Sequence, residues 1–202
     1  MDLKALYRKY YTYNSQALNT PNQFLDSVKK TRRLQLIPDI AISLLEIKAR
    51  IALGELRKAK QLLKVVTPLI DQSQDHFYHG QLFLVENMLI SATSTALEQS
   101  IENLNLAEQS QKQCGSKALE CEIIIARVQT NPVEMEITTC EDSLKLAMRL
   151  AMDADLPDLM IAVYLAYIQV YQSHQLPNLA DREMQLLALL IVESSSTQHH
   201  QV

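Results

Sequence analysis

The stretch from Ile40 to Ile70, IAISLLEIKARIALGELRKAKQLLKVVTPLI, decides the fold of this chain. Its apolar residues recur at helical spacing, in two runs separated by Gly54. The runs are Ile40, Leu44, Ile47 and Ile51, and then Leu56, Ala59, Leu63, Val66 and Ile70. Because a glycine can end a helix in the left-handed conformation, we expect two helices of about four turns joined there. Such helices lie antiparallel, and each has more apolar surface than its partner covers, so the hairpin needs neighbours of its own kind.

Composition favours an all-α protein. The chain has 202 residues, of which 48% are hydrophobic and 21% are charged, as in ordinary folded proteins. It has three glycines, and no β-branched segments alternate between Asn-Gly or Asp-Gly turns, as they would in a sheet. No segment is apolar for long enough to span a bilayer, and the N-terminus lacks the apolar core of a signal peptide. With an odd count of three cysteines, we expect free thiols and an intracellular protein.

Charge is unevenly distributed along the chain. Residues 1–64 hold 13 Lys and Arg against 5 Asp and Glu, whereas residues 65–202 hold 6 against 18. The densest basic cluster consists of Lys29, Lys30, Arg32 and Arg33. Such a cluster can dock an acidic protein surface or a nucleic-acid backbone, or it can be a solvated helix face. We take these four cations as candidate partner-binding residues for an acidic protein, and nucleic acid as the less favoured partner.

Two helices are expected before the hairpin. The first covers residues 2–14, and the second runs from Pro21 to about residue 36, with Thr20 as its N-cap. Within the hairpin, Pro68 is expected to kink or end the second helix, since proline lacks the N–H that continues the hydrogen-bond ladder.

Three further helix pairs are expected after the hairpin. Thr95 and Glu98 form the sequence pattern of a capping box, and Gly115 is a suitable helix stop. Asn131-Pro132 breaks the following helix. Another helix is expected to begin near Thr139 with acidic residues in its first turn. After residue 193 the sequence is polar and aperiodic, so we expect a disordered tail.

The second helices of the pairs begin at regular intervals. Their starts are Leu56, Leu97, Cys140 and Leu179, separated by 41, 43 and 39 residues. Three positions later stand Ala59, Ser100, Ser143 and Arg182, of which three are small. A helix pair that recurs about every 40 residues indicates an α-solenoid. We expect about four antiparallel hairpins in residues 38–193, N-terminal helices in residues 1–37 and a disordered tail at residues 194–202.

The first hairpin resembles a tetratricopeptide repeat. The residues that match the family's turn glycine, large, alanine, large and small positions are Gly54, Leu56, Ala59, Leu63 and Val66. Ile47 stands where that family usually has glycine, and the other pairs lack most of the signature. The resemblance implies a degenerate α-solenoid with long repeats.

A second resemblance is to the subunit 5 family of the anaphase-promoting complex. It covers about half of the chain and rests mainly on the five-residue run Ile101-Glu102-Asn103-Leu104-Asn105. The last helix pair, with Asp181-Arg182-Glu183-Met184, is loosely similar to that family's final helices. The family's members are much longer, so this chain would be a fragment, a truncated form or a divergent relative. The resemblance implies a non-catalytic scaffold subunit of a ubiquitin ligase of the cell cycle, in the nucleus and the cytoplasm.

Patterns that carry enzyme chemistry are absent from the sequence. It has no glycine-rich phosphate loop, no H-E-x-x-H motif and no G-x-S-x-G motif. His76 and His79 lie one turn apart, and Cys114 and Cys121 are close in sequence, but no further ligand completes a metal site. Cys140, near a helix N-terminus, could have a lowered thiol pKa, yet no histidine stands beside it. We therefore expect no catalytic, metal or cofactor site, and a protein that is not an enzyme.

Two kinds of function agree with these features. The first is a scaffold that holds other protein subunits, with no small-molecule substrate and no membrane contact. The second is a stand-alone helical-repeat module that binds peptides and regulates another protein. That module needs a ladder of polar side chains on the first helices of successive repeats, and only Lys48, Arg50 and Asn87 are available. The scaffold is therefore the preferred hypothesis.

Overall fold

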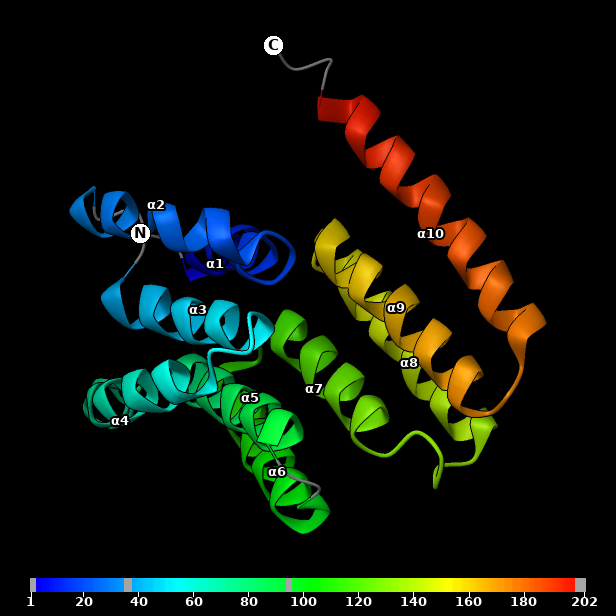
Figure 1. Ribbon diagram of the computed structural model, residues 1–202, viewed down its shortest axis with the longest axis horizontal. Helices are drawn as coiled ribbons and strands as arrows, with labels where there is room; N and C mark the ends of the chain where they lie inside the picture. The colour runs from blue at the N-terminus through cyan, green and yellow to red at the C-terminus, as the bar shows by residue number, and fades with distance from the viewer. Residues whose placement is uncertain (1–2, 35–37, 94–95, 199–202) are drawn as a thin grey trace. The chain divides into compact units, whose positions relative to one another are not determined.

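The computed structural model describes residues 3–34, 38–93 and 96–198, and the side chains of those that lie between residues 9 and 192. Within these ranges the chain forms ten α-helices and no β-strand (Figure 1). The helices are α1 (Leu3–Asn19), α2 (Pro21–Arg33), α3 (Asp39–Ala52), α4 (Leu56–Ser73), α5 (His76–Thr93), α6 (Leu97–Cys114), α7 (Lys117–Thr130), α8 (Ile137–Asp153), α9 (Pro157–Ser173) and α10 (Pro177–Gln198). The prediction of an all-α protein is confirmed.

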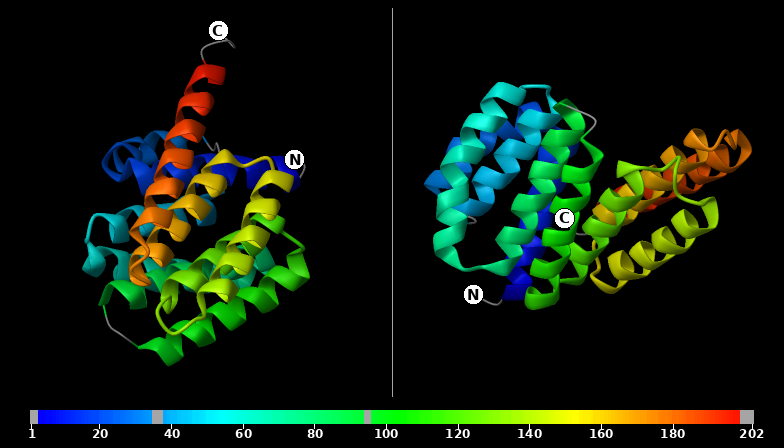
Figure 2. Two further views of the ribbon diagram at one scale, coloured as in Figure 1. Left: turned by 90° about the vertical axis from the view of Figure 1, so that its right-hand side faces the viewer. Right: turned by 90° about the horizontal axis from the view of Figure 1, so that it is seen from below.

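The chain divides into two compact units, unit 1 (residues 1–116) and unit 2 (residues 117–202). Consecutive helices form antiparallel hairpins: α1 with α2, α3 with α4 and α5 with α6 in unit 1, and α7 with α8 and α9 with α10 in unit 2 (Figure 2). Inside each unit the hairpins also pack on one another, through α1, α3 and α5 in the first and through α7, α8 and α9 in the second. This is the hairpin packing of an α-solenoid, as predicted. The expected domain boundaries at residues 38 and 194 stay predictions.

Helix α3 is the centre of unit 1, because α1, α2, α4 and α5 all pack against it (Figure 1). Its apolar side chains therefore lie in the core on more than one side. Those with no exposed surface are Ala41, Ile42, Leu44, Leu45, Ile47 and Ala49. Burial of a side chain as large as Leu or Ile stabilises a fold by about 1.5–3 kcal/mol. The hairpin thus finds the neighbours that its surplus apolar surface requires.

Glycines end two helices where the sequence predicts it. Gly54 follows α3 with φ of 73°, and Gly115 follows α6 with φ of 64°. The N–H of Gly115 donates to the carbonyl of Gln111 at 2.7 Å, which satisfies one of the free carbonyls at the end of α6. Helix α7 ends at Thr130, directly before Asn131-Pro132, which is also the predicted break.

The sequence predicts that Pro68 kinks or ends α4, and the structure shows that it does not end the helix; a kink there stays a prediction. The helix continues to Ser73 and ends at Gln74, which has φ of 53°. Pro68 is exposed and has no N–H, so the carbonyl of Lys64 loses its usual helical donor. Ile70, two residues further on, is fully buried. The burial of Ile70 holds the last turn of α4 in place despite the missing hydrogen bond.

Other helix ends differ from the predictions by a few residues. Pro21 is at the start of α2, as predicted, but the hydroxyl of Thr20 donates to the carbonyl of Gln16 in α1 instead of capping α2. Helix α1 runs to Asn19, five residues beyond its predicted end. Once the ladder of backbone hydrogen bonds has begun, each added residue gains one bond, so a helix extends until a proline or a left-handed residue stops it.

Helices in the C-terminal half also extend beyond their predicted bounds. Helix α8 begins at Ile137, so Glu141 lies in the second turn and not, as predicted, in the first. Helix α10 continues to Gln198, past residue 193, where a disordered tail was expected. The predicted capping box involves Thr95, which lies outside the described residues; α6 itself begins at Leu97.

Helix α9 packs against α7, α8 and α10 and forms the centre of unit 2. Its Tyr171 hydroxyl donates to Oε1 of Glu141 on α8 at 2.9 Å, and its Tyr167 hydroxyl donates to the Glu141 backbone carbonyl at 3.1 Å. On α10 the buried residues are Ala180 and Glu183. They stand one position after Leu179 and Arg182, so the inward-facing positions of the last hairpin are shifted by one residue from the repeat register.

Candidate protein-interaction surfaces

The predicted basic cluster lies at the end of α2, with Lys30, Arg32 and Arg33 in the last turn and Lys29 directly before it. Its four members differ in their exposure and pairing. Lys29, Lys30 and Arg33 are exposed, and none forms an ion pair with any residue that the structure describes. The apolar side chains that α2 buries are Phe24 and Val28. Three of the four cations therefore remain available to a partner.

Arg32 is engaged within unit 1. Its guanidinium donates to Oδ1 of Asp39 at 3.1 Å, to Oγ of Ser43 at 3.0 Å and to Oε2 of Glu46 at 3.4 Å. All three acceptors lie on α3, so Arg32 fastens the end of α2 to the start of α3. Whether the cluster binds a partner stays a prediction, but Arg32 has a structural role that the sequence alone does not reveal.

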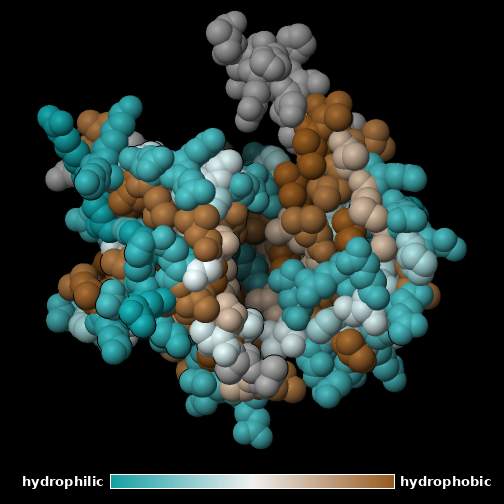
Figure 3. Space-filling view, viewed as in Figure 1, coloured by the Kyte–Doolittle hydropathy of each residue, from teal (hydrophilic) through white to brown (hydrophobic). Residues whose placement is uncertain are grey.

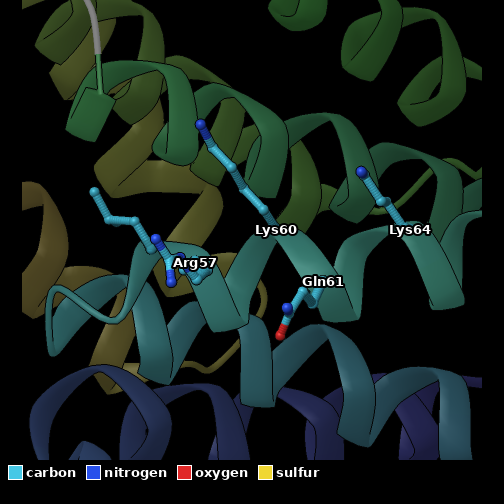
Figure 4. Close-up of a pocket in the computed structure, with 5 residues that line it drawn as sticks. Arg57, Lys60, Gln61 and Lys64 are labelled. Atoms are coloured by element: carbon cyan, nitrogen blue, oxygen red, sulfur yellow. The ribbon is translucent and has the colours of Figure 1, made fainter.

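A second basic surface lies on α4. A depression of about 520 Å³ is lined by Leu56, Arg57, Lys60, Gln61 and Lys64 (Figure 4). Figure 4 shows the side chains of Lys60 and Lys64 extending in the same direction, whereas Gln61 points the other way. Sequence reasoning missed this surface, although residues 56–70 contain four cations and no acidic residue.

The α4 cations differ in their pairing. Lys58 donates to Oε1 of Glu55 at 2.8 Å. Across the described ranges, no carboxylate pairs with Arg57, Lys60 or Lys64, and all three are exposed. Because residues 57 and 64 are seven apart, their Cα atoms are separated by about 10 Å along the helix. The three unpaired charges thus form a positive stripe about two turns long.

A third surface is the outer face of α10. The sequence LLALLIV at residues 186–192 places apolar side chains on every side of this helix, and within unit 2 the helix packs on α9 alone. Figure 3 shows brown, apolar surface along α10. The exposed members are Met184, Leu186, Leu189, Ile191 and Val192; Leu189 is 62% exposed. In the sequence, this surface is indicated by the unbroken apolar run. The structure adds that the helix has one neighbour within unit 2.

Two of the three residues of the polar ladder on which a peptide-binding groove would depend, Lys48 and Arg50, already have partners within unit 1. Lys48 is 2% exposed, and its Nζ donates to Oδ1 of Asn14 and to Oε1 of Gln81, each at 2.8 Å. The guanidinium of Arg50 pairs with Glu46 at 2.7 Å and with Glu55 at 2.6 Å. The third member of the ladder, Asn87, is buried.

Of the three cysteines, Cys121 and Cys140 are buried and Cys114 is half-buried. Cys140 is buried, and burial raises its thiol pKa, whereas its position near a helix N-terminus had suggested a lowered one. Desolvation dominates because Cys140 has no exposed surface. Burial likewise raises the pKa of Cys121 to about 12, with Glu122 and Glu120 adding to the effect.

The histidines that stand one turn apart face different surroundings. His76 is exposed, whereas Nε2 of His79 lies 3.6 Å from Oδ1 of Asp71. In the part of the chain that the structure describes, no three His, Cys, Asp or Glu side chains are grouped to hold a metal ion. No helix in that part is long and apolar enough to cross a membrane.

No protein-family model matches the chain, and no curated protein or solved structure is significantly similar to it. The likeness to tetratricopeptide repeats and to the subunit 5 family therefore rests on the residues quoted above.

Proposed function

We propose that the protein is a non-catalytic scaffold that holds other protein subunits in a complex. The observation that supports this proposal is the outer face of α10. Within unit 2, α10 packs on α9 alone, yet it is apolar on every side from residue 186 to residue 192. A helix of this kind belongs in the core of a larger body.

The scaffold acts by burying this face against a helix or a hairpin of a partner. Leu189 and Leu186 lie one turn apart and would enter the grooves between side chains of the partner helix. Each buried leucine contributes about 1.5–3 kcal/mol of transfer free energy, so a few of them dominate such a contact.

A narrower form of the proposal names the complex. If the resemblance to the subunit 5 family holds, the complex is a ubiquitin ligase, the anaphase-promoting complex. The protein would then act in the cell cycle, in the nucleus or the cytoplasm. The five-residue identity that carries this resemblance includes Asn103 and Leu104, which are buried, and Ile101, which is exposed. All three lie on α6, which packs on α5, and are not part of the α10 surface.

The alternative function is a stand-alone peptide-binding regulatory module. It receives less support, because Lys48 and Arg50 already form hydrogen bonds and ion pairs within unit 1 and Asn87 is buried. A peptide would have to displace these contacts before it could use the same side chains.

Affinity purification of the tagged full chain from its own cells, followed by mass spectrometry, tests the scaffold. Three forms are compared: the unmodified chain, Leu189→Glu and the matched control Val133→Glu. Val133 is 68% exposed and Leu189 is 62% exposed, so both substitutions place one charge at an equally accessible apolar position of unit 2. We expect a stoichiometric set of subunits with the unmodified chain and the control, and its loss with Leu189→Glu.

Two outcomes would contradict the proposal. Recovery of the unmodified chain alone would favour the peptide-binding module. Equal recovery of partners with Leu189→Glu and with the unmodified chain would show that α10 is not the contact. If the recovered set is a ubiquitin ligase, the narrower form of the proposal is also supported; an unrelated set would keep the scaffold and exclude the ligase.

A further inference from the structure

Side chains of helix α1 reach past the neighbouring hairpin to the third hairpin of unit 1. In a regular solenoid each hairpin contacts only the hairpins next to it. Here the hydroxyl of Tyr10 donates to Oε1 of Gln81 on α5 at 3.0 Å, and Nε2 of Gln81 donates to the hydroxyl of Tyr11 at 3.2 Å. The rings of Tyr10 and Tyr11 lie 5.3 Å and 6.2 Å from the ring of Phe77, also on α5. Because α1 packs on α3 as well, it lies across both helices.

The surface of α3 and α5 that α1 covers, which we call the α1 site, binds this helix through buried polar atoms. Nζ of Lys48 on α3 donates to Oδ1 of Asn14 on α1 and to Oε1 of Gln81, each at 2.8 Å. Lys48 is 2% exposed and Gln81 has no exposed surface, so water does not compete for these bonds. Ala17, three residues after Asn14, is fully buried, and a larger side chain there would push α1 away. The α1 site therefore fits a helix with two adjacent tyrosines, then an asparagine and a small residue at spacings of three.

Helix α2 is held on α3 by contacts that do not involve α1. Its Arg32 donates hydrogen bonds to three side chains of α3. Thr20 is the single residue between Asn19, the last residue of α1, and Pro21, the first residue of α2. Pro21 lacks the N–H that would continue α1 into α2 as one helix. Thr20 is thus a hinge about which α1 can move while α2 stays on α3.

Release of α1 uncovers groups that water can solvate. Lysine and glutamine side chains normally lie at the protein surface, and the burial of Lys48 and Gln81 is offset by hydrogen bonds that α1 helps to supply. When α1 leaves, water replaces those hydrogen bonds. The main loss is the packing of Tyr10 and Tyr11, which are 1% and 2% exposed. An identical helix from a second copy of the chain restores that packing in full.

We propose that α1 exchanges between two copies of this chain. In the exchanged dimer, α1 of each copy fills the α1 site of the other, and α1 is the helix that the structure shows to fit that site. Every contact of α1 with α2, α3 and α5 is made again in the dimer, so the closed monomer and the dimer differ mainly at Thr20. A connection of one residue favours exchange over a closed hairpin. The contacts involve unit 1 alone, so the exchange is independent of the α10 partner.

The concentration of the chain decides between the two forms. In the monomer, α1 is held near its own site at an effective concentration on the order of 1 mM, so the dimer forms when the chain concentration approaches that value. Refolding at about 1 mM therefore gives the dimer, whereas refolding at about 1 μM gives the monomer. Since exchange requires the release of α1 from a buried site, a dimer that has formed separates slowly after dilution.

Size-exclusion chromatography with light scattering, on the full chain refolded from urea at both concentrations, tests the proposal. Insertion of Gly-Ser-Gly-Ser after Thr20 gives the hairpin a longer connection, and we expect it to weaken dimerisation about tenfold. The matched control has the same insertion after Val133, an exposed position between α7 and α8, and should dimerise like the unmodified chain. Leu189→Glu should also leave the dimer unchanged. A dimer that is lost with Leu189→Glu and kept with the Thr20 insertion would assign the contact to α10 and overturn the exchange.

A synthetic peptide of residues 3–19 tests the α1 site itself. Present in excess while the full chain refolds at about 1 mM, it should occupy the site and suppress the dimer. A peptide with Tyr10→Phe and Asn14→Leu lacks the hydroxyl that bonds Gln81 and the amide that bonds Lys48, so it should be about tenfold less effective. A chain that stays monomeric after refolding at about 1 mM would overturn the proposal. A dimer that forms equally in the presence of either peptide would also overturn it.

Discussion

Nζ of Lys48 on α3 lies 2.8 Å from Oε1 of Gln81 on α5. The same nitrogen donates to Oδ1 of Asn14 on α1, and the hydroxyl of Tyr10 donates to Gln81 Oε1 at 3.0 Å. The ring of Tyr10 lies 5.6 Å from the ammonium group, within reach of a cation–π contact. One buried lysine thus connects the first helices of the three hairpins in unit 1.

Replacement of Lys48 by methionine, which has a similar length, should destabilise the protein. It removes two hydrogen bonds from a charged donor and leaves the oxygen of Asn14 buried without that donor. We expect a loss of about 3 kcal/mol in the free energy of unfolding, measured by urea denaturation. The control Lys60→Met changes an exposed lysine of α4 and should cost less than about 0.5 kcal/mol. Equal losses at the two positions would contradict this role.

Pro68→Ala should stabilise the protein. Proline inside a helix destabilises the folded state by about 3 kcal/mol relative to alanine. Its rigidity lowers the entropy of the unfolded chain, which offsets about 1 kcal/mol of this cost. Since Pro68 is exposed and little packing is lost, we expect a net gain of about 2 kcal/mol. Thermal unfolding measures it, with Val65→Ala as the control for a simple alanine effect on the exposed side of α4. A lower melting temperature for Pro68→Ala would contradict the account of α4.

Glu86→Gln should stabilise the protein at neutral pH but not in acid. Burial, and then the charge of Asp71, raises the pKa of Glu86 on α5. The folded state therefore holds this proton more tightly than the unfolded state does. The resulting stability is present below the unfolded pKa of 4.5 and is lost as pH rises through the folded value. We expect a gain in the free energy of unfolding near pH 7 and none near pH 3, measured by denaturation at both.

Burial of two weak acids should make the protein sensitive to base. Burial raises the pKa of Cys121 from 9.0 to about 12, and burial together with the Glu141 hydrogen bond raises that of Tyr171 from 10.0 to about 12. Both groups stabilise the fold below their unfolded pKa, and that stability is lost as pH rises towards about 12. In Cys121→Ala, the fall in stability above about pH 9 should be shallower than in the unmodified chain. An unchanged slope would contradict the prediction.

The helix pairs could be predicted because their signals are local. Gly54 and Gly115 end helices through their own backbone conformation, and helical spacing in residues 40–70 marks the core of unit 1. At the small positions of the repeat, Ala59 and Ser100 are buried, whereas Ser143 is half-buried. Those features depend on a few neighbouring residues, so they can be predicted from the sequence alone.

The remaining features depend on contacts between distant residues. Lys48 has the pattern of an exposed ladder residue and lies in the core because Asn14 and Gln81 meet it there. Arg32 stands in a run of four cations, yet α3 supplies its partners. The exposed face of α10 likewise depends on which helices pack beside it, and that cannot be deduced from the apolar run alone.

The central claim is that the outer face of α10 is covered by another protein. Hydroxyl-radical footprinting of the full chain, alone and in its purified assembly, measures this directly. Met184 on α10 is 42% exposed and Met152 on α8 is 59% exposed, so both oxidise readily in the free chain. The scaffold account predicts that assembly protects Met184 and Leu189 while Met152 stays reactive. Unchanged oxidation of Met184 and Leu189 in the assembly would contradict it.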